Sequence, residues 1–267
     1  MKAFWFRLLA WLGGCSLLAL CLTGCGTVPV TGRSQLNLIS PGQEMQLGFS
    51  SFQQMKKDVP VSKDAQANAL LQKVGKRIAA SAAGDLPNAQ WEFVVFESKE
   101  ANAFCLPGGK VGVYTGLLPI TKDEEGLATV LGHEIAHAAA HHGAERMSQQ
   151  LLAQTGGSLL QSGLANSDPR TQAIATTVYG LGAKVGVLLP YSRLHESEAD
   201  RMGLRYMARA GYRPETAVDF WQRFAEFNRQ QGGSGGLWLL RTHPVDEKRI
   251  EQIRAWLPEA KAEFKPQ

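Results

Sequence analysis

Two histidines separated by three residues, His133 and His137, lie in an apolar stretch of helix-forming sequence, with Glu134 between them. Histidines four positions apart project from one face of a helix, so both imidazoles can reach a single metal ion. Zinc suits such a pair, because it takes nitrogen ligands tetrahedrally and can keep one position for water. Glu134 points toward that water, where its carboxylate can act as a general base. The spacing indicates a hydrolytic zinc site, although so short a motif also arises by chance.

A catalytic zinc site of this kind needs a third protein ligand. The metzincin pattern would place glycine at position 140 and histidine at 143, but the chain has Ala140 and Gly143, which excludes that class. The alternative is a carboxylate on a later helix, and Glu196 and Asp200 lie four apart on one face of a predicted helix. We expect Glu196 to bind the zinc and Asp200 to accept a hydrogen bond from the outer nitrogen of a ligating histidine.

Some neighbouring polar residues are expected to take no part in catalysis or metal binding, and the same is expected of the cysteine in the predicted domain. Glu198 falls on another face of the helix that carries Glu196, so we expect it to be exposed to solvent, and we expect the same of His195. Cys105 has no second cysteine in the predicted domain with which to form a disulfide. It is therefore predicted to be a buried, inert thiol.

Helices predominate among the elements that must position these residues. Helical patterns fall at about residues 62–84, 122–142 and 194–210, from 214 onward and after 244. Strand patterns fall at residues 91–96, 102–106 and 111–114. Residues 148–190 indicate two helices joined near 166–169, and ordinary helix packing is favoured there over a lid or a membrane-facing flap. The predicted fold class is α+β, mainly helical, with a small sheet beside the zinc helix.

The N-terminus has the pattern of a bacterial lipoprotein signal. Lys2 and Arg7 frame its positive start, and an apolar stretch of fifteen residues follows, which is short for a bilayer span of about 20 residues. Leu22-Thr23-Gly24-Cys25 resembles a lipobox, which implies cleavage before Cys25 and lipid attachment to it; an uncleaved anchor is the alternative. Residues 1–24 are thus predicted to be a signal peptide, 25–42 a lipidated N-terminus and tether, and 43–267 a single zinc metallopeptidase domain.

The residue after the predicted lipidated cysteine indicates a cellular location, and the net charge bears on possible partners. Gly26 stands where an aspartate usually retains lipoproteins at the inner membrane, so we expect an outer-membrane lipoprotein that faces the periplasm. The net charge is +4, from 28 basic and 24 acidic residues, and two of the basic residues lie in the predicted signal. Such a balance, without a basic stripe, gives no reason to expect nucleic-acid binding.

Four blocks of sequence match, in order, the gluzincin family that includes the CAAX prenyl proteases, HtpX, BepA and LoiP. The blocks are Asn102-Ala103-Phe104 with Pro107-Gly108-Gly109; His133 to His137; Glu196 to Asp200 with Gly203; and Thr242-His243-Pro244 with Arg249 and Ile250. The chain resembles this family over residues 102–250, and the lipobox makes LoiP-like periplasmic lipoproteins the most similar group. The resemblance implies a gluzincin-type domain.

The resemblance also implies roles that the residues alone do not. Asn102, Ala103 and Phe104 resemble the strand beside the zinc cleft that pairs with the substrate backbone, although a plain core hairpin is compatible with Phe104. His243 and Arg249 resemble residues that approach the metal and stabilise the oxyanion.

His243 could instead bind zinc as a fourth ligand and hold the enzyme closed, with the Gly-rich residues 232–236 allowing its movement. The family pattern at His142 implies a structural hydrogen bond.

The expected function is a zinc-dependent endopeptidase with one Zn²⁺ per chain. Its expected substrates are misfolded or misassembled periplasmic and outer-membrane proteins, met near the membrane that holds the lipid anchor. Outer-membrane assembly machinery, or a second protease or chaperone, is the expected partner. The alternative is a chaperone-like outer-membrane assembly factor with a latched or mainly structural zinc site. The intact Glu134 argues against that alternative, because a structural site needs no base.

Overall fold

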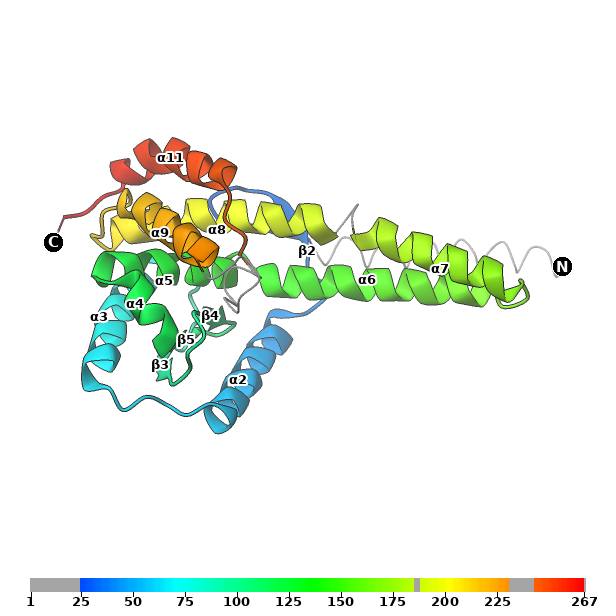
Figure 1. Cartoon of the computed structure of the whole chain (residues 1–267), viewed down its shortest axis with the longest axis horizontal. Coiled ribbons are helices and arrows are strands. Elements are labelled where there is room, and N and C mark those ends of the chain that lie inside the picture. Colours follow the sequence, from blue (N-terminus) through cyan, green and yellow to red (C-terminus); the bar gives the residue numbers. More distant parts are fainter. Residues whose placement is uncertain (1–24, 185–187, 231–242, 267) are drawn as a thin grey trace.

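The computed structural model describes residues 25–184, 188–230 and 243–266. The elements in chain order are β1 (Cys25–Thr27), β2 (Ser34–Leu36), α2 (Pro41–Asp58), α3 (Ala65–Ser81), β3 (Glu92–Phe96), β4 (Ala103–Leu106), β5 (Lys110–Tyr114), the 3-10 turn η1 (Thr115–Leu117), α4 (Leu118–Thr121), α5 (Glu124–Ala139), α6 (His142–Gly163), α7 (Pro169–Ala183), α8 (Leu189–Arg209), α9 (Thr216–Gln230) and α11 (Glu247–Ala262). Helices surround one small sheet (Figure 1), which confirms the α+β, mainly helical fold class. Among the described residues, no helix combines the length and hydrophobicity that crossing a bilayer requires.

Helix α5 runs through the centre of the core. Between Gly126 and Ala139 every residue except His137 is buried, as expected for a helix that is apolar on all sides. Asp123 caps its N-terminus by accepting a hydrogen bond from the Gly126 amide. The helical pattern at residues 122–142 is interrupted, because His141 adopts a left-handed φ of 52° and α6 begins directly after it.

Helix α8 packs along α5 at a contact between two glycines. A Cβ atom on Gly132 would lie 2.9 Å from the carbonyl oxygen of Gly203, and one on Gly203 would lie 2.9 Å from the His133 amide nitrogen. The absence of side chains lets the two backbones approach closely. This contact places His133 of α5 beside Glu196 of α8, although 63 residues separate them in the sequence.

The sheet has the order β3-β5-β4, with β3 parallel and β4 antiparallel to β5. The turn between β4 and β5 contains Gly108 and Gly109, both with a φ of 80°, a conformation that favours glycine. Within the described part of the chain, β4 pairs only with β5 and is therefore an edge strand.

The segment at residues 25–38, here called the N-terminal arm, packs on the domain instead of forming the free tether expected for residues 25–42. Its strands β1 and β2 form an antiparallel hairpin. The Gln35 side-chain amide donates to the Ala140 carbonyl at 2.7 Å, and the Leu38 amide donates to Ser148 Oγ at 2.9 Å. Lipid attachment to Cys25 stays a prediction. Helix α2, which the sequence analysis does not include, follows the arm.

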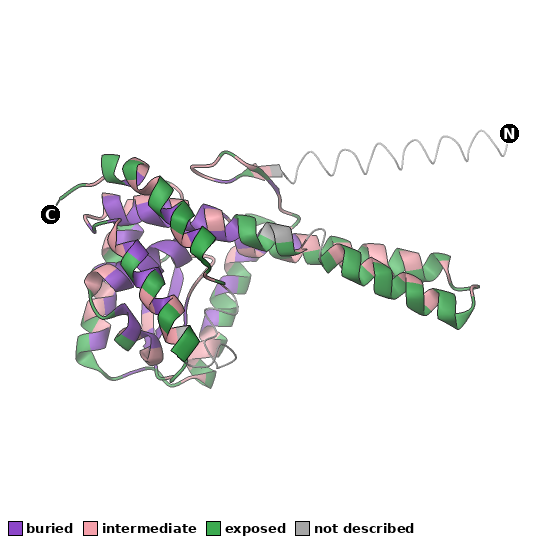
Figure 2. Ribbon diagram, turned by 45° about the horizontal axis from the view of Figure 1, so that its top comes forward, coloured by how far each residue is buried: buried purple, intermediate pink, exposed green. Residues whose placement is uncertain are grey.

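Helices α6 and α7 form a helical hairpin that projects from the rest of the molecule (Figures 1 and 2). Two helices in this region agree with the sequence pattern, and the helix packing expected here is a packing of these two helices on each other. None of the residues described in α7 is buried, and the buried residues of α6 all lie between His142 and Ser148. The two helices pack on each other, and Tyr179 Oη donates to the Ala153 carbonyl at 3.0 Å.

Candidate active site

Four side chains from three parts of the chain bring one donor atom each to a single point. The atoms belong to His133, His137, Glu196 and His243, and all lie within 4.8 Å of one another. His133 Nε2 is 3.1 Å from His137 Nε2 and 3.2 Å from His243 Nδ1. The Glu196 carboxylate oxygens lie 3.3 Å from both His133 Nε2 and His137 Nε2. Donors bound tetrahedrally to zinc at about 2.0–2.1 Å stand roughly 3.3 Å apart, so this spacing fits zinc.

A second layer of buried charge holds His133. Its Nδ1 lies 2.9 Å from Asp200 Oδ1, the arrangement that the i, i+4 spacing of Glu196 and Asp200 predicts. Arg249 grips Asp200 with two nitrogens at 2.7 and 2.9 Å, and its guanidinium lies 4.3 Å from the centre of the Trp221 ring. Such a carboxylate fixes the tautomer and orientation of a ligating imidazole.

Arg249 lies against the carboxylates of the site, and its contact with an oxyanion stays a prediction. Its Nη1 lies 3.1 Å from Glu196 Oε2 and donates to the Pro244 carbonyl at 2.9 Å. The guanidinium is buried and satisfied by the carboxylates of the site. This geometry favours a residue that orients the metal-binding carboxylates over one that contacts the oxyanion.

Glu134 is buried at the edge of the donor set. Burial raises the pKa of its carboxyl group. Its Oε1 atom has no hydrogen-bond partner among the residues that the structure describes, and it lies 3.5 Å from His243 Nε2. A buried carboxylate oxygen without a partner is costly in a folded protein unless it serves a purpose. The position suits a base that acts on a water molecule next to the metal.

A cleft of about 680 Å³ opens onto this site. Glu134, His137, Glu196 and His243 line one side, and β4 with its flanking residues lines another. The Tyr114 amide donates to the Asn102 carbonyl at 3.0 Å. Because hydrogen-bonded pairs alternate along antiparallel strands, the backbone groups of residues 103 and 105 face the free edge of β4.

The three residues expected to bind substrate take different positions. Asn102 and Ala103 are buried at the wall of the cleft. The Phe104 ring packs edge-on against Phe52 and Tyr114, with ring centres 6.2 and 6.3 Å apart, as a core hairpin would have it. All three residues line the cleft, and their predicted role in binding substrate stays a prediction.

Cys105 is half-buried on β4. Burial raises the pKa of its thiol, which favours the protonated form, and its inertness stays a prediction.

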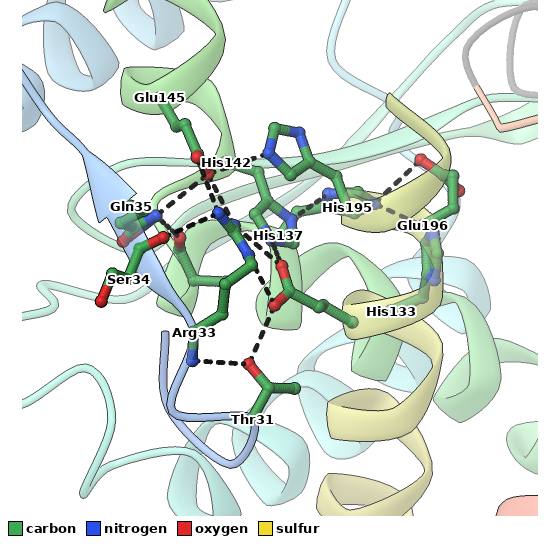
Figure 3. Close-up of polar contacts among 12 residues, drawn as sticks. Thr31, Arg33, Ser34, Gln35, His133, His137, His142, Glu145, His195 and Glu196 are labelled. Carbon is green, nitrogen blue, oxygen red and sulfur yellow. Dashed lines mark hydrogen bonds and ion pairs between the residues drawn. The ribbon is translucent and has the colours of Figure 1, made fainter. Parts of the chain in front are cut away.

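Two predictions about exposure are wrong. Glu198 is buried and lies 3.1 Å from His142 Nε2, and His195 is buried with its Nε2 2.9 Å from Glu145 Oε2. Both belong to a buried polar cluster beside the metal-binding residues, and Figure 3 shows His195 in it with Glu145 and His142. The cause is Arg33 of the N-terminal arm, whose guanidinium binds Glu145 and Glu198 at 2.7 and 2.9 Å. No pattern in the sequence signals this partner.

Two histidines that follow α5 in the sequence have carboxylate partners of their own. His142 makes a structural hydrogen bond to Glu198, in the manner that the resemblance implies. His141 Nδ1 lies 2.7 Å from Glu44 Oε2 of α2, and this contact raises the pKa of the imidazole.

Comparison with known proteins places this geometry in a family. The model of peptidase family M48 matches residues 65–257. The chain is 32% identical to the mitochondrial metalloendopeptidase OMA1 of Saccharomyces cerevisiae, over 93% of this chain and 73% of that protein. It is 35% identical to OMA1 of Schizosaccharomyces pombe, over 87% and 66%. It is 30% identical to the beta-barrel assembly-enhancing protease of Escherichia coli, over 85% of this chain but only 46% of that protein.

These relatives contradict the predicted location. Similar proteins from two yeasts, cattle and Arabidopsis thaliana are all named as mitochondrial, which points away from a bacterial outer-membrane lipoprotein facing the periplasm. The prediction depended on a four-residue lipobox, a short pattern in an apolar stretch, most of which lies outside the described residues. The family itself is established by a match across most of the chain and by relatives named as metalloendopeptidases. The chain therefore belongs to peptidase family M48, and it is a metalloendopeptidase.

Proposed function

We propose that this protein is a zinc-dependent endopeptidase that cleaves extended, unfolded segments of other proteins, with the ion held by His133, His137 and Glu196. The observation that carries the proposal is a donor set with zinc spacing, accompanied by Glu134, in the wall of a cleft that also contains a free strand edge.

The roles of the side chains follow from their positions. A bound zinc ion supplies Lewis acidity, which polarises the scissile carbonyl and lowers the pKa of water at the site. Glu134 accepts the proton of the attacking water and delivers it to the leaving amine. Burial raises the pKa of this carboxyl group, which makes its carboxylate a stronger base for the first of these transfers. Asp200 and Arg249 keep His133 and Glu196 oriented toward the ion.

His243 restrains the site in this proposal. Its Nδ1 lies 2.8 Å from Glu196 Oε1 and 3.2 Å from His133 Nε2, inside the donor set. Four protein donors fill the tetrahedron in which a catalytic zinc site keeps one position for water. In this proposal the described conformation would be a closed state, and movement of the His243 ring out of the donor set would open a position for water. The Gly-rich residues 232–236 lie outside the described residues.

Substrate binding is proposed to use the free edge of β4. An extended peptide laid along it would pair with the backbone groups of residues 103 and 105. Main-chain pairing needs an unfolded segment and places few demands on its sequence. Removal of misfolded or misassembled proteins is the corresponding biological role. The name of the E. coli relative, a beta-barrel assembly-enhancing protease, supports that role. The narrower likeness to LoiP-like lipoproteins stays a prediction.

A second candidate function is a chaperone-like assembly factor whose zinc site is structural. The observation that favours it is the completeness of the four-donor set, since structural zinc sites are closed. Glu134 argues against it, because a structural site gives no reason to bury beside the donors a carboxylate whose Oε1 atom has no hydrogen-bond partner among the described residues.

The Glu134→Gln variant separates these functions. Zinc content and cleavage of a reduced, carboxymethylated protein are measured for wild type and variant. We expect the variant to retain zinc and to lose cleavage by about 100-fold or more, as for removal of a general base. Equal cleavage by both proteins would refute the protease mechanism. Zinc in both, with no cleavage by wild type or by His243→Ala, would favour the chaperone-like factor.

A further inference from the structure

A chain of polar contacts runs from His137 to the N-terminal arm (Figure 3). His142 Nδ1 lies 2.8 Å from His137 Nδ1, on the side of the ring that faces away from the donor set. His142 Nε2 lies 3.1 Å from Glu198 Oε2. Arg33 of the arm donates to both oxygens of Glu198 at 2.9 Å, and Thr31 Oγ1 donates to the same carboxylate at 2.8 Å.

The contacts that reach His137 resemble those of His133: in each case a buried carboxylate is held by an arginine. His133 is backed by Asp200, and Arg249 grips that carboxylate with two nitrogens. His137 is backed through one further imidazole by Glu198, which Arg33 grips in the same way. Both carboxylates are buried. The two arginines differ in their place in the sequence. Arg249 lies inside the residues that match the family model, whereas Arg33 lies before them.

Arg33 also joins two helices of the domain. It grips Glu145 of α6 with two nitrogens, at 2.8 and 2.7 Å, while it holds Glu198 of α8. Burial raises the pKa of the Glu145 carboxyl, but hydrogen bonds from Arg33 and His195 outweigh it and lower the pKa to about 2. The arginine is therefore the cation that lets two buried carboxylates stand next to the metal-binding residues.

We propose that Arg33 is a positioning residue for the zinc site, and that docking of the N-terminal arm sets the orientation of His137 through Glu198 and His142. The inference rests on the proposed zinc site. Without Arg33, Glu198 keeps only single contacts from Thr31 to Oε1 and from His142 to Oε2, so the carboxylate and the His142 ring that it anchors are held less firmly. His137 Nδ1 then loses the contact that orients the imidazole for the metal. Displacement of the arm would have the same effect.

The test compares Arg33→Ala with Arg205→Ala in the full chain. Arg205 is a matched control, because its side chain is 20% exposed against 19% for Arg33, and it too bridges two carboxylates, Glu259 and Glu263, at the α11 side of α8. The zinc dissociation constant is measured by competition with a chromophoric chelator, and kcat and KM are measured at saturating zinc.

We expect Arg33→Ala to weaken zinc binding about 10–100-fold, the usual effect of removing an outer partner of a metal ligand, and to lower kcat with little change in KM. Arg205→Ala should bind zinc as wild type does. Equal zinc affinity in Arg33→Ala and wild type would overturn the inference, and so would equal losses in both alanine variants.

Lysine variants keep the test decisive if Arg33→Ala does not fold. Arg33→Lys retains the charge but cannot grip two oxygens of one carboxylate, so zinc binding should weaken severalfold relative to Arg205→Lys. No difference between the lysine variants would overturn the inference. Wild type that binds zinc, with unaffected Arg33 variants, refutes only the role of Arg33. Wild type that binds no zinc refutes the proposed function instead.

Discussion

The His133 imidazole lies between Asp200 and Glu196, and this pairing governs how the site takes up zinc as pH changes. Burial alone would lower the pKa of His133, but the two carboxylates outweigh burial and raise the pKa to about 9. Zinc must then displace a proton at neutral pH. We expect zinc affinity to rise from pH 6 to about 9, with proton release that calorimetry detects in buffers of different ionisation enthalpy.

The same shift has a consequence for the metal-free protein. A histidine pKa raised above its ordinary value of 6.5 stabilises the fold fully below pH 6.5 and loses that contribution as pH rises through about 9. The Tm of the metal-free protein should therefore fall between pH 7 and 9.5. A zinc affinity that stays constant over pH 6–9 would contradict the pairing of His133 with both carboxylates.

His243 contributes a donor atom where a catalytic zinc site keeps water. The His243→Ala variant removes this donor and leaves His133, His137 and Glu196, which is the usual ligand number of a catalytic site. We expect retained zinc and a severalfold faster cleavage of an unfolded protein. An unchanged or abolished rate, with zinc retained, would remove support for the closed state.

At the residue scale, the sequence predicts contacts within a helix better than contacts between distant segments. The positions of His133 and His137 follow from helical periodicity, and so does the shared face of Glu196 and Asp200. Glu198 and His195 were expected to be exposed because charged helix faces usually are. They are buried because Arg33, 165 residues from Glu198, supplies the cation, and no local pattern encodes so distant a pairing.

The contact between α5 and α8 is the element that brings the metal-binding residues together. A Cβ atom at position 203 would lie 2.9 Å from the His133 amide nitrogen and 3.0 Å from the Gly132 carbonyl carbon. Gly203→Ala would therefore force the helices apart, which costs about 1–3 kcal/mol. We expect a lower free energy of unfolding, measured with urea, together with weaker zinc binding.

Gly180→Ala is the matched control for this substitution. Gly180 also lies in a helix, α7, but no atom stands within 4 Å of the Cβ that alanine would add there. Alanine at an open helical position stabilises by about 0.5–1 kcal/mol, because it reduces backbone entropy in the unfolded chain. A Gly203→Ala variant as stable as wild type would show that the two helices tolerate a wider separation.

The free edge of β4 is the second element with a testable role. Proline at position 105 removes a backbone N–H that faces the cleft and leaves the hydrogen bonds to β5, which residues 104 and 106 make. We expect Cys105→Pro to lower kcat/KM for an unfolded protein about tenfold or more, with zinc content unchanged. Cys105→Ala, which keeps the N–H, should cleave like wild type. Equal loss in both variants would point to the side chain instead of the strand edge.

The elements themselves were partly predictable. Periodicity located the helices that surround the site, the three strands of the central sheet and the glycine turn between β4 and β5, because these signals are local. The docked arm lies within a stretch rich in turn-forming residues, which suggested a tether, and helix α2 begins at its end. The break in the zinc helix at His141 was also missed, since a single left-handed residue does not disturb the apolar pattern.

The whole molecule divides into a compact body and the helical hairpin that projects from it (Figure 2). Six large apolar side chains along the hairpin are exposed: Leu151, Leu152, Leu159, Ile174, Val178 and Leu181. Sequence patterns show that a helix has apolar residues, but not which surface covers them. In the compact body, α5, α8 and the N-terminal arm position the metal-binding residues.

This division predicts that the body keeps its site when the hairpin is shortened. Residues 157–176 can be replaced by a two-residue Asn-Gly turn, which retains the Tyr179 contact to Ala153 and the buried start of α6 from His142 to Ser148. Because the removed residues bury little surface against the body, we expect the zinc dissociation constant to stay within twofold and the Tm to change by only a few degrees. Thermal unfolding and chelator competition on the full chain and the shortened chain measure both. A large loss of zinc affinity would show that the hairpin braces Glu145 and His142, and would extend the positioning network from the arm into α7.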